Sequence, residues 1–116
     1  MTFPSPAADF AEGRLSLDEH LIENKDATFF FRMSGGTLAG FGIHDGDLLV
    51  VDRAVEPTDL NVVVAVIDGE FLIRQICYAP EGVRLRTDSP GQSDIVIGAG
   101  QELTVWGVVR HSIHRV

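Results

Sequence analysis

The first clear hydrophobic pattern along the chain is that of a short amphipathic helix. Ser16 stands three residues before Glu19, as in a capping box, and Leu17 and Leu21 lie on one face of the predicted helix. Polar residues interrupt this pattern near Asn24. The sequence therefore predicts one short helix that starts from Ser16.

Strand-like patterns replace the helical pattern in the rest of the chain. Runs rich in apolar, aromatic and β-branched residues predict strands at 28–33, 48–51, 62–67, 71–77, 83–86, 94–97 and 103–109. Asp68 and Gly69 separate two of these runs and predict a hairpin of type I′, because glycine tolerates the positive φ that this turn requires. Short strands joined by turns are typical of an all-β fold, here with minor helix.

The N-terminal residues have a different character. Pro4 and Pro6 are followed by small residues, a composition that favours an extended segment over a packed one. A length of 116 residues corresponds to a single domain of ordinary size. We therefore expect residues 1–14 to form a flexible arm and residues 15–116 to form one folded domain.

The balance of charge and the single cysteine restrict the function classes. The formal net charge is −8, with 9 basic and 17 acidic residues. Affinity for nucleic acid comes mainly from Lys and Arg, so this chain is not expected to bind DNA by itself. Cys77 cannot form an internal disulfide, and neither a membrane span nor a signal peptide is evident. These features predict a cytoplasmic protein that has no membrane partner.

Four segments form a more specific combination. They are residues 3–9 (FPSPAAD), 34–38 (SGGTL), 42–52 (GIHDGDLLVVD) and 69–74 (GEFLIR). With these segments the chain resembles the UmuD branch of the LexA/UmuD family of self-cleaving serine peptidases, from Phe3 to about His114. The resemblance implies a compact, curved β scaffold of the LexA/signal-peptidase type, in which residues 15–116 correspond to the C-terminal peptidase domain.

Two positions differ from the pattern of that family. Its serine nucleophile lies in an S-G-D-S-M segment, where this chain has Thr37, and its lysine base is separated from G-E-F by two residues, where this chain has Arg74. A buried, partly neutral lysine can accept the proton of the serine, whereas arginine keeps its own proton. The only lysine, Lys25, precedes the first predicted strand. The resemblance thus implies a pseudo-peptidase with no intact catalytic residue.

Other arrangements of reactive residues are less specific. Ser34 could pair with a histidine, the candidates being His20, His44, His111 and His114, but nothing in their spacing supports such a pair. His111 and His114 are three residues apart, so on a strand they point to opposite faces and are not expected to share a metal ion. Gly35 and Gly36 lack the Gly-Lys-Ser/Thr of a phosphate loop. The sequence predicts neither a metal nor a cofactor.

The resemblance also implies a role. The chain starts at Met1, two residues before Phe3, where the processed product of the family begins. Our leading hypothesis is a catalytically inactive, UmuD′-like accessory subunit of an error-prone Y-family DNA polymerase in SOS translesion synthesis. The expected partners are a second copy and the polymerase subunit, through which alone it would reach DNA. Residues 103–109 and the strand end that follows them are expected near the dimer interface, because this apolar run would otherwise present an unpaired edge.

Two alternatives stay open. The first is a regulator that forms a heterodimer with an intact UmuD- or LexA-like protein. The second is a weakly active self-cleaving peptidase that uses Thr37 with an unidentified base. A RecA filament is a further candidate partner for a protein of this family. A neighbouring polymerase gene would favour the accessory subunit over the regulator.

Overall fold

The computed structural model describes residues 16–34, 38–98 and 100–116. The predicted N-terminal arm and Thr37 lie outside the described residues. The helical elements are α2 (Leu17–Leu21) and two 3₁₀ turns, η1 (Lys25–Ala27) and η2 (Ala39–Phe41). The strands are β1 (Thr28–Arg32), β2 (Leu48–Asp52), β3 (Val62–Ile67), β4 (Glu70–Ala79), β5 (Gly82–Arg86), β6 (Ile95–Ile97) and β7 (Thr104–Ile113).

These elements confirm the all-β fold with minor helix. Each predicted strand is present, although β4 and β7 are longer than their apolar runs. The helix begins as predicted, because the Ser16 side chain accepts a hydrogen bond from the Glu19 backbone N–H at 3.5 Å. It ends earlier than predicted, at Leu21, because Ile22 has an extended backbone. Among the described residues, no helix is long and apolar enough to cross a membrane.

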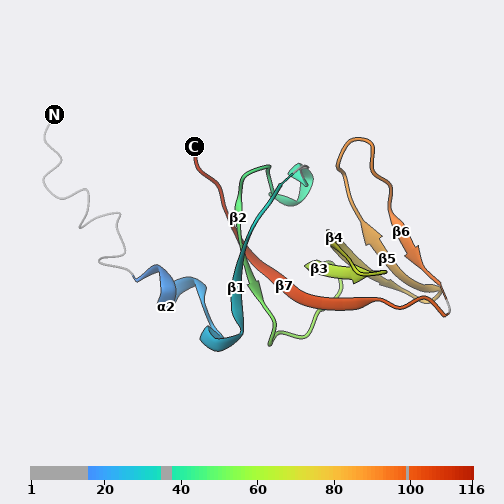
Figure 1. Cartoon of the computed structure of the whole chain (residues 1–116), viewed down its shortest axis with the longest axis horizontal. Coiled ribbons are helices and arrows are strands. Elements are labelled where there is room, and N and C mark those ends of the chain that lie inside the picture. The colour runs from blue at the N-terminus through green and yellow to red at the C-terminus, as the bar shows by residue number, and fades with distance from the viewer. Residues whose placement is uncertain (1–15, 35–37, 99) are drawn as a thin grey trace, which may run out of the picture.

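The seven strands form one antiparallel sheet in the order β1-β2-β7-β3-β4-β5-β6. Figure 1 shows that the long strand β7 joins two groups of strands, β1 and β2 on one side and β3 to β6 on the other. The expectation that residues 103–109 form an unpaired edge was wrong, because β7 lies between β2 and β3. The outer strands are β1 and β6.

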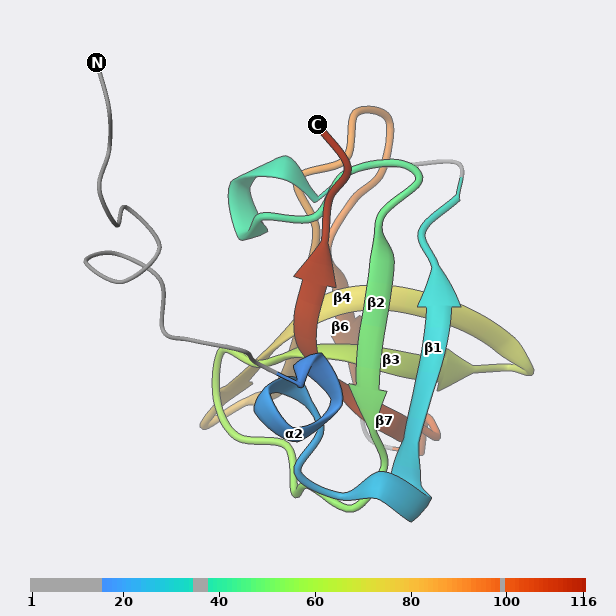
Figure 2. The same ribbon diagram turned by 90° about the vertical axis from the view of Figure 1, so that its left-hand side faces the viewer.

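Irregularities in the pairing of β7 accompany the curvature of the sheet. The register shifts between Val50 and Val51 where β7 pairs with β2, and again between Val64 and Ala65 where it pairs with β3. Such bulges bend a strand and increase its local twist. The two groups of strands can therefore turn away from each other while β7 stays paired with both, as Figure 2 shows from the side.

The curved sheet encloses two hydrophobic clusters, and β3 contributes to both. Val63, Ala65 and Ile67 belong to one buried cluster, whereas Val64 belongs to the other. Successive side chains of a strand point to opposite faces, so a strand that is covered on both faces needs a continuous apolar run. This requirement explains why residues 62–67 read VVVAVI without polar alternation.

The predicted hairpin determines the register of β3 and β4. Asp68 has a φ of 51° and Gly69 has a φ of 77°, as a type I′ turn requires. From this turn the pairing proceeds without a recorded shift and places Arg74 opposite Val63 and Ile73 opposite Val64. The turn thus fixes the position of Arg74 relative to the cores.

Gly107 provides a test of the close packing between β7 and β2. A Cβ atom at Gly107 would lie 2.7 Å from Val51 Cγ1 and 3.3 Å from the Asp52 carbonyl oxygen. We expect Gly107→Ala to lower the free energy of unfolding by about 1–3 kcal/mol, because overpacking forces the neighbours to move. Urea denaturation followed by tryptophan fluorescence measures this change.

Gly98 is the matched control for this substitution. A Cβ atom at Gly98 would have no neighbour within 4 Å. Gly98→Ala should therefore change the stability by no more than about 0.5 kcal/mol, as is usual for open surface positions. Equal effects of the two substitutions would contradict the packing argument.

Candidate functional site

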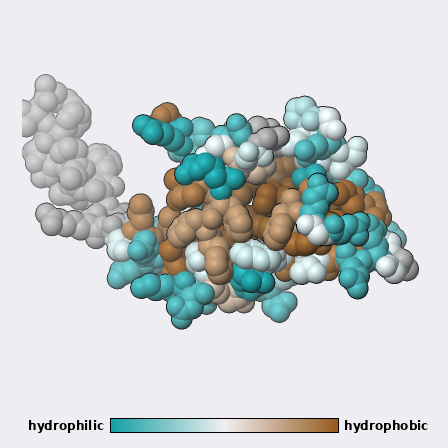
Figure 3. Space-filling view, viewed as in Figure 1, coloured by the Kyte–Doolittle hydropathy of each residue, from teal (hydrophilic) through white to brown (hydrophobic). Residues whose placement is uncertain are grey.

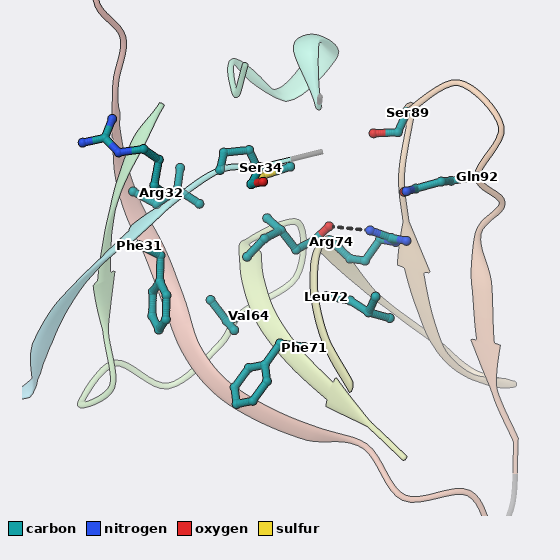
Figure 4. A pocket seen from close by; sticks show the side chains of 12 residues that line it. Phe31, Arg32, Ser34, Val64, Phe71, Leu72, Arg74, Ser89 and Gln92 are labelled. Atoms are coloured by element: carbon teal, nitrogen blue, oxygen red, sulfur yellow. Dashed lines mark hydrogen bonds between the residues drawn. The ribbon is translucent and has the colours of Figure 1, made fainter. Parts of the chain in front are cut away.

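Arg74 is the centre of the candidate site. It lies on β4, and only 8% of its surface is exposed. Its Nη1 donates a hydrogen bond to the Ile73 carbonyl oxygen at 2.8 Å, while its buried Nε has no hydrogen-bond partner among the described residues. Figure 4 shows the guanidinium directed toward Ser89 and Gln92, with Ser34 on the other side of the pocket. The residue expected in place of the family's lysine is thus buried beside a pocket.

The pocket beside Arg74 has a volume of about 290 Å³. Its walls come mainly from β1, β2, β3 and β4 and are largely apolar, and its polar groups come from Arg32 on β1, Arg74 on β4, the segment after β1 and the loop after β5. The lining residues are Phe31, Arg32, Met33, Ser34, Leu49, Val64, Phe71, Leu72, Ile73, Arg74, Ser89 and Gln92. Such a pocket can accept apolar side chains and offer hydrogen-bond donors to a carbonyl or a carboxylate.

Aromatic side chains extend the apolar surface next to this pocket. The ring of Trp106 contacts Phe29, Phe31 and Phe71 in edge-to-face arrangements, with centroids 5.2, 5.1 and 6.5 Å away. Phe29 and Phe71 are exposed, and Figure 3 shows apolar side chains gathered over the middle of one face of the molecule. Exposed apolar surface of this kind often marks an interaction site.

The electrostatic environment leaves Arg74 charged. Burial lowers the pKa of the Arg74 guanidinium from its ordinary value, whereas the carboxylates of Asp94 and Glu70 raise it. Arginine starts from so high a pKa that it keeps its proton under all ordinary conditions. Arg74 can therefore donate hydrogen bonds and stabilise negative charge, but it cannot accept a proton from a nucleophile.

The chain's single lysine, Lys25, does not line this pocket. Lys25 lies in η1, before β1, and lines a separate surface hollow with Asp18, Glu19 and Ile22. Thr37, expected in place of the nucleophile, lies outside the described residues. Its described sequence neighbours are Ser34, which lines the pocket, and Leu38, which is buried.

The Ser-His alternative gains no support from the described residues. Two of its four histidines, His44 and His114, are placed beside Asp47 instead of Ser34. Among the described residues, Ser34 has no recorded hydrogen bond to a histidine. No histidine is among the described residues that line the pocket with Ser34.

His114 has a partner that the sequence did not suggest. Although His114 is exposed, its Nδ1 lies 2.8 Å from Asp47 Oδ1. The interaction joins residues 67 positions apart, and it arises because antiparallel pairing of Leu48 with Ile113 brings the start of β2 beside the end of β7. The available signal in the sequence was the presence of Asp47 just before one predicted strand and His114 after another. The pairing that brings the two residues together is not visible in the sequence.

Asp47 lies at the centre of a polar cluster formed with His44, Ser112 and His114. It is 1% exposed, and its carboxylate accepts hydrogen bonds from the His44 backbone N–H at 2.9 Å and from Ser112 Oγ at 2.8 Å. Burial raises the pKa of the Asp47 carboxyl. Hydrogen bonds from His44, His114 and Ser112, together with the charge of His114, more than offset burial and lower this pKa to about 2.

The lowered pKa predicts how stability depends on acid. Because the folded state holds the pKa of Asp47 below its ordinary value of 3.8, its stabilising contribution is present above about pH 4 and is lost as the pH falls toward 2. We expect Asp47→Asn to be less stable at neutral pH and to have a flatter dependence of unfolding free energy on pH between 4 and 2. Urea denaturation at a series of pH values measures both.

Asp68→Asn is the matched control for this measurement. Asp68 is an exposed carboxylate in the hairpin turn, and asparagine tolerates its positive φ. This variant should retain the wild-type dependence on pH. The same slope in wild type and Asp47→Asn would show that the carboxylate of Asp47 does not contribute as the structure indicates.

Comparisons with known proteins agree with this architecture. The family model for Peptidase S24-like proteins matches residues 1–110. Protein ImpA of Salmonella typhimurium is 41% identical over 114 residues, which cover 97% of this chain and 77% of ImpA. Protein MucA of Escherichia coli is 33% identical over 96% of this chain and 76% of MucA. LexA repressor 2 of Geobacter sulfurreducens is 30% identical over 91% of this chain and 52% of the repressor.

These matches cover nearly the whole chain and include the strands that form both hydrophobic clusters. The antiparallel sheet with one minor helix is consistent with the LexA/UmuD type of fold. The chain therefore belongs to the Peptidase S24-like family.

Proposed function

We propose that this protein is a catalytically inactive, UmuD′-like accessory subunit of an error-prone Y-family DNA polymerase in SOS translesion synthesis. The observation that carries the proposal is the buried Arg74 beside the pocket. Its motif puts Arg74 at the position where the resemblance implies a lysine base. Similarity to ImpA and MucA over nearly the whole chain supports a role in SOS mutagenesis. In this proposal the family fold is retained, and the protein uses it to bind a partner.

The chemistry of Arg74 is the reason for the inactive assignment. A Ser-Lys dyad requires a neutral amine beside the nucleophile, and burial produces one by lowering the pKa of lysine. The same burial acts on Arg74, but its guanidinium still keeps its proton. The methyl group of Thr37 adds a second obstacle, because it restricts the side-chain rotamers of the residue that would attack.

The homodimer is part of the proposal. Residues 104–108 of β7 include the partners of β3, whereas the pairs recorded for residues 109–113 are with β2 alone. Among the described residues, no strand pairs with the other edge of this last part of β7. An open strand edge is a template for pairing with another chain, and a second copy would satisfy it symmetrically.

The surface charge favours a protein partner over DNA. With a formal net charge of −8, the chain has little capacity to release counterions from a phosphate backbone. The proposed subunit therefore reaches DNA only through the polymerase. This is also the point that separates the proposal from a regulator of an intact UmuD- or LexA-like protein, which needs no polymerase.

The inactive assignment predicts the outcome of a restoration experiment. The wild-type chain should not cleave an intact family precursor, even at alkaline pH, because Arg74 keeps its proton there and cannot act as a base. The double variant Thr37→Ser with Arg74→Lys should gain measurable cleavage that increases with pH, since its lysine becomes neutral. Electrophoresis of the precursor over time measures both.

The control for restoration keeps the nucleophile but omits the base. Thr37→Ser with Arg74→Gln should remain inactive at every pH. Cleavage by the wild-type chain that Thr37→Ala abolishes would contradict the inactive assignment and favour the residual peptidase instead.

The partner assignment predicts coupled loss of dimer and polymerase binding. Ile113, at the end of β7, and Val96, on β6, are both exposed apolar residues. Ile113→Glu should convert the dimer into a monomer at about 10 µM and weaken capture of the cognate polymerase, because a charge at a standard-sized interface is costly to desolvate. Val96→Glu should retain both properties. Sedimentation and a pull-down provide the measurements.

Two results would contradict this assignment. One is the absence of polymerase capture by the wild-type chain, which favours the regulator. The other is tight, salt-sensitive DNA binding by the chain alone, which the acidic surface should prevent.

A further inference from the structure

Two histidines and a buried carboxylate meet where the turn before β2 contacts the segment after β7. His114 Nδ1 lies 2.8 Å from Asp47 Oδ1, and His44 Nδ1 lies 3.6 Å from Asp47 Oδ2. The two imidazole rings have centroids 5.0 Å apart. Figure 2 shows the C-terminal segment beside the start of β2, next to the turn that precedes this strand. This cluster has no role in the proposed accessory function.

We propose that His44, Asp47 and His114 form a binding site for a divalent transition-metal ion of the zinc class. Each residue offers one ligand atom, and these atoms all lie within 4.8 Å of one another. Two imidazole nitrogens and one carboxylate oxygen suit Zn²⁺, Co²⁺, Ni²⁺ or Cu²⁺. They do not suit Mg²⁺ or Ca²⁺, which prefer ligand sets made entirely of oxygen.

The ligand atoms, which lie within 4.8 Å of one another, must move closer together to receive the ion. Bonds of about 2.0–2.2 Å in a tetrahedral site hold the ligand atoms roughly 3.4 Å apart. The 3.6 Å from His44 Nδ1 to Asp47 Oδ2 is close to this value, whereas the 2.8 Å from His114 Nδ1 to the other carboxylate oxygen, Oδ1, must widen. The side chains of His44 and His114 are 47% and 52% exposed, so both rings have room to move.

Asp47 is held in place by groups outside the ligand set. Its Oδ2 accepts hydrogen bonds from Ser112 Oγ and from the His44 backbone N–H. Its Oδ1 faces the His114 ring. Hydrogen-bond partners that orient a ligating carboxylate are typical of metal sites and contribute to their affinity.

The ion would take the place of a proton. A ligating imidazole nitrogen must be deprotonated, so binding through His114 Nδ1 releases to solvent any proton held there beside Asp47. Because both rings are half-exposed, water completes the coordination. His111, although close in sequence to His114, does not belong to the cluster.

Metal titration of the full chain tests this site. After treatment with a chelator and its removal, the protein is titrated with Zn²⁺ by calorimetry, and with Co²⁺ by absorption spectroscopy. We expect one Zn²⁺ per chain in the wild type. Ser112→Ala, which removes a supporting hydrogen bond, should weaken binding by about 10–100-fold, and His44→Gln and His114→Gln, which each remove a ligand, by at least as much.

His111→Gln is the matched control, since it removes a histidine from β7 without touching the cluster. It should bind Zn²⁺ as the wild type does. His44 and His114 are half-exposed, so their variants are expected to fold, which circular dichroism verifies. Absence of saturable binding in the micromolar range, unchanged binding in both His44→Gln and His114→Gln, or equal loss in His111→Gln would overturn the proposal.

Discussion

The pairing of β7 with both β2 and β3 is the interaction on which the rest of the structure depends. Without it, β1 and β2 would be separated from the other strands, and the two hydrophobic clusters would belong to no common sheet. The close approach of Gly107 to Val51 and the two register shifts let one strand satisfy both partners while the sheet curves. The pocket of Arg74 and the cluster of Asp47 both depend on this arrangement, because each draws residues from β2 or its flanks.

Retention of the fold and the proposed loss of catalysis have separate physical origins. The apolar side chains that bury β3 and the walls of the pocket do not require a catalytic base, so the scaffold can hold Arg74 at the position where we expect the family's lysine. Burial of a guanidinium whose Nε has no partner among the described residues costs stability, which the surrounding core must offset. What remains is a charged donor in an apolar pocket, and this combination can bind a ligand but cannot activate a hydroxyl.

The sequence was most informative where the determining interactions are local. The hairpin at Asp68 and Gly69, the cap at Ser16 and the apolar run of β3 depend on neighbouring residues, and all three were predicted. The position of β7 and the meeting of His114 with Asp47 depend on which strands pair, which no local pattern specifies. The identity of Arg74 was readable from its motif, but its burial came only from the structure, and Thr37 lies outside the described residues.

The two proposals meet at the end of β7. The edge that we assign to the dimer includes Ile113, and His114 follows it directly in the chain. An ion held by His44, Asp47 and His114 would fix this segment against the turn before β2, and so reduce the conformational entropy that a partner must otherwise remove on binding. A ligand that binds the ordered segment more tightly favours any assembly that needs the same order. The metal site and the dimer edge are therefore thermodynamically coupled if dimerisation orders the residues after β7, even though neither contains the other.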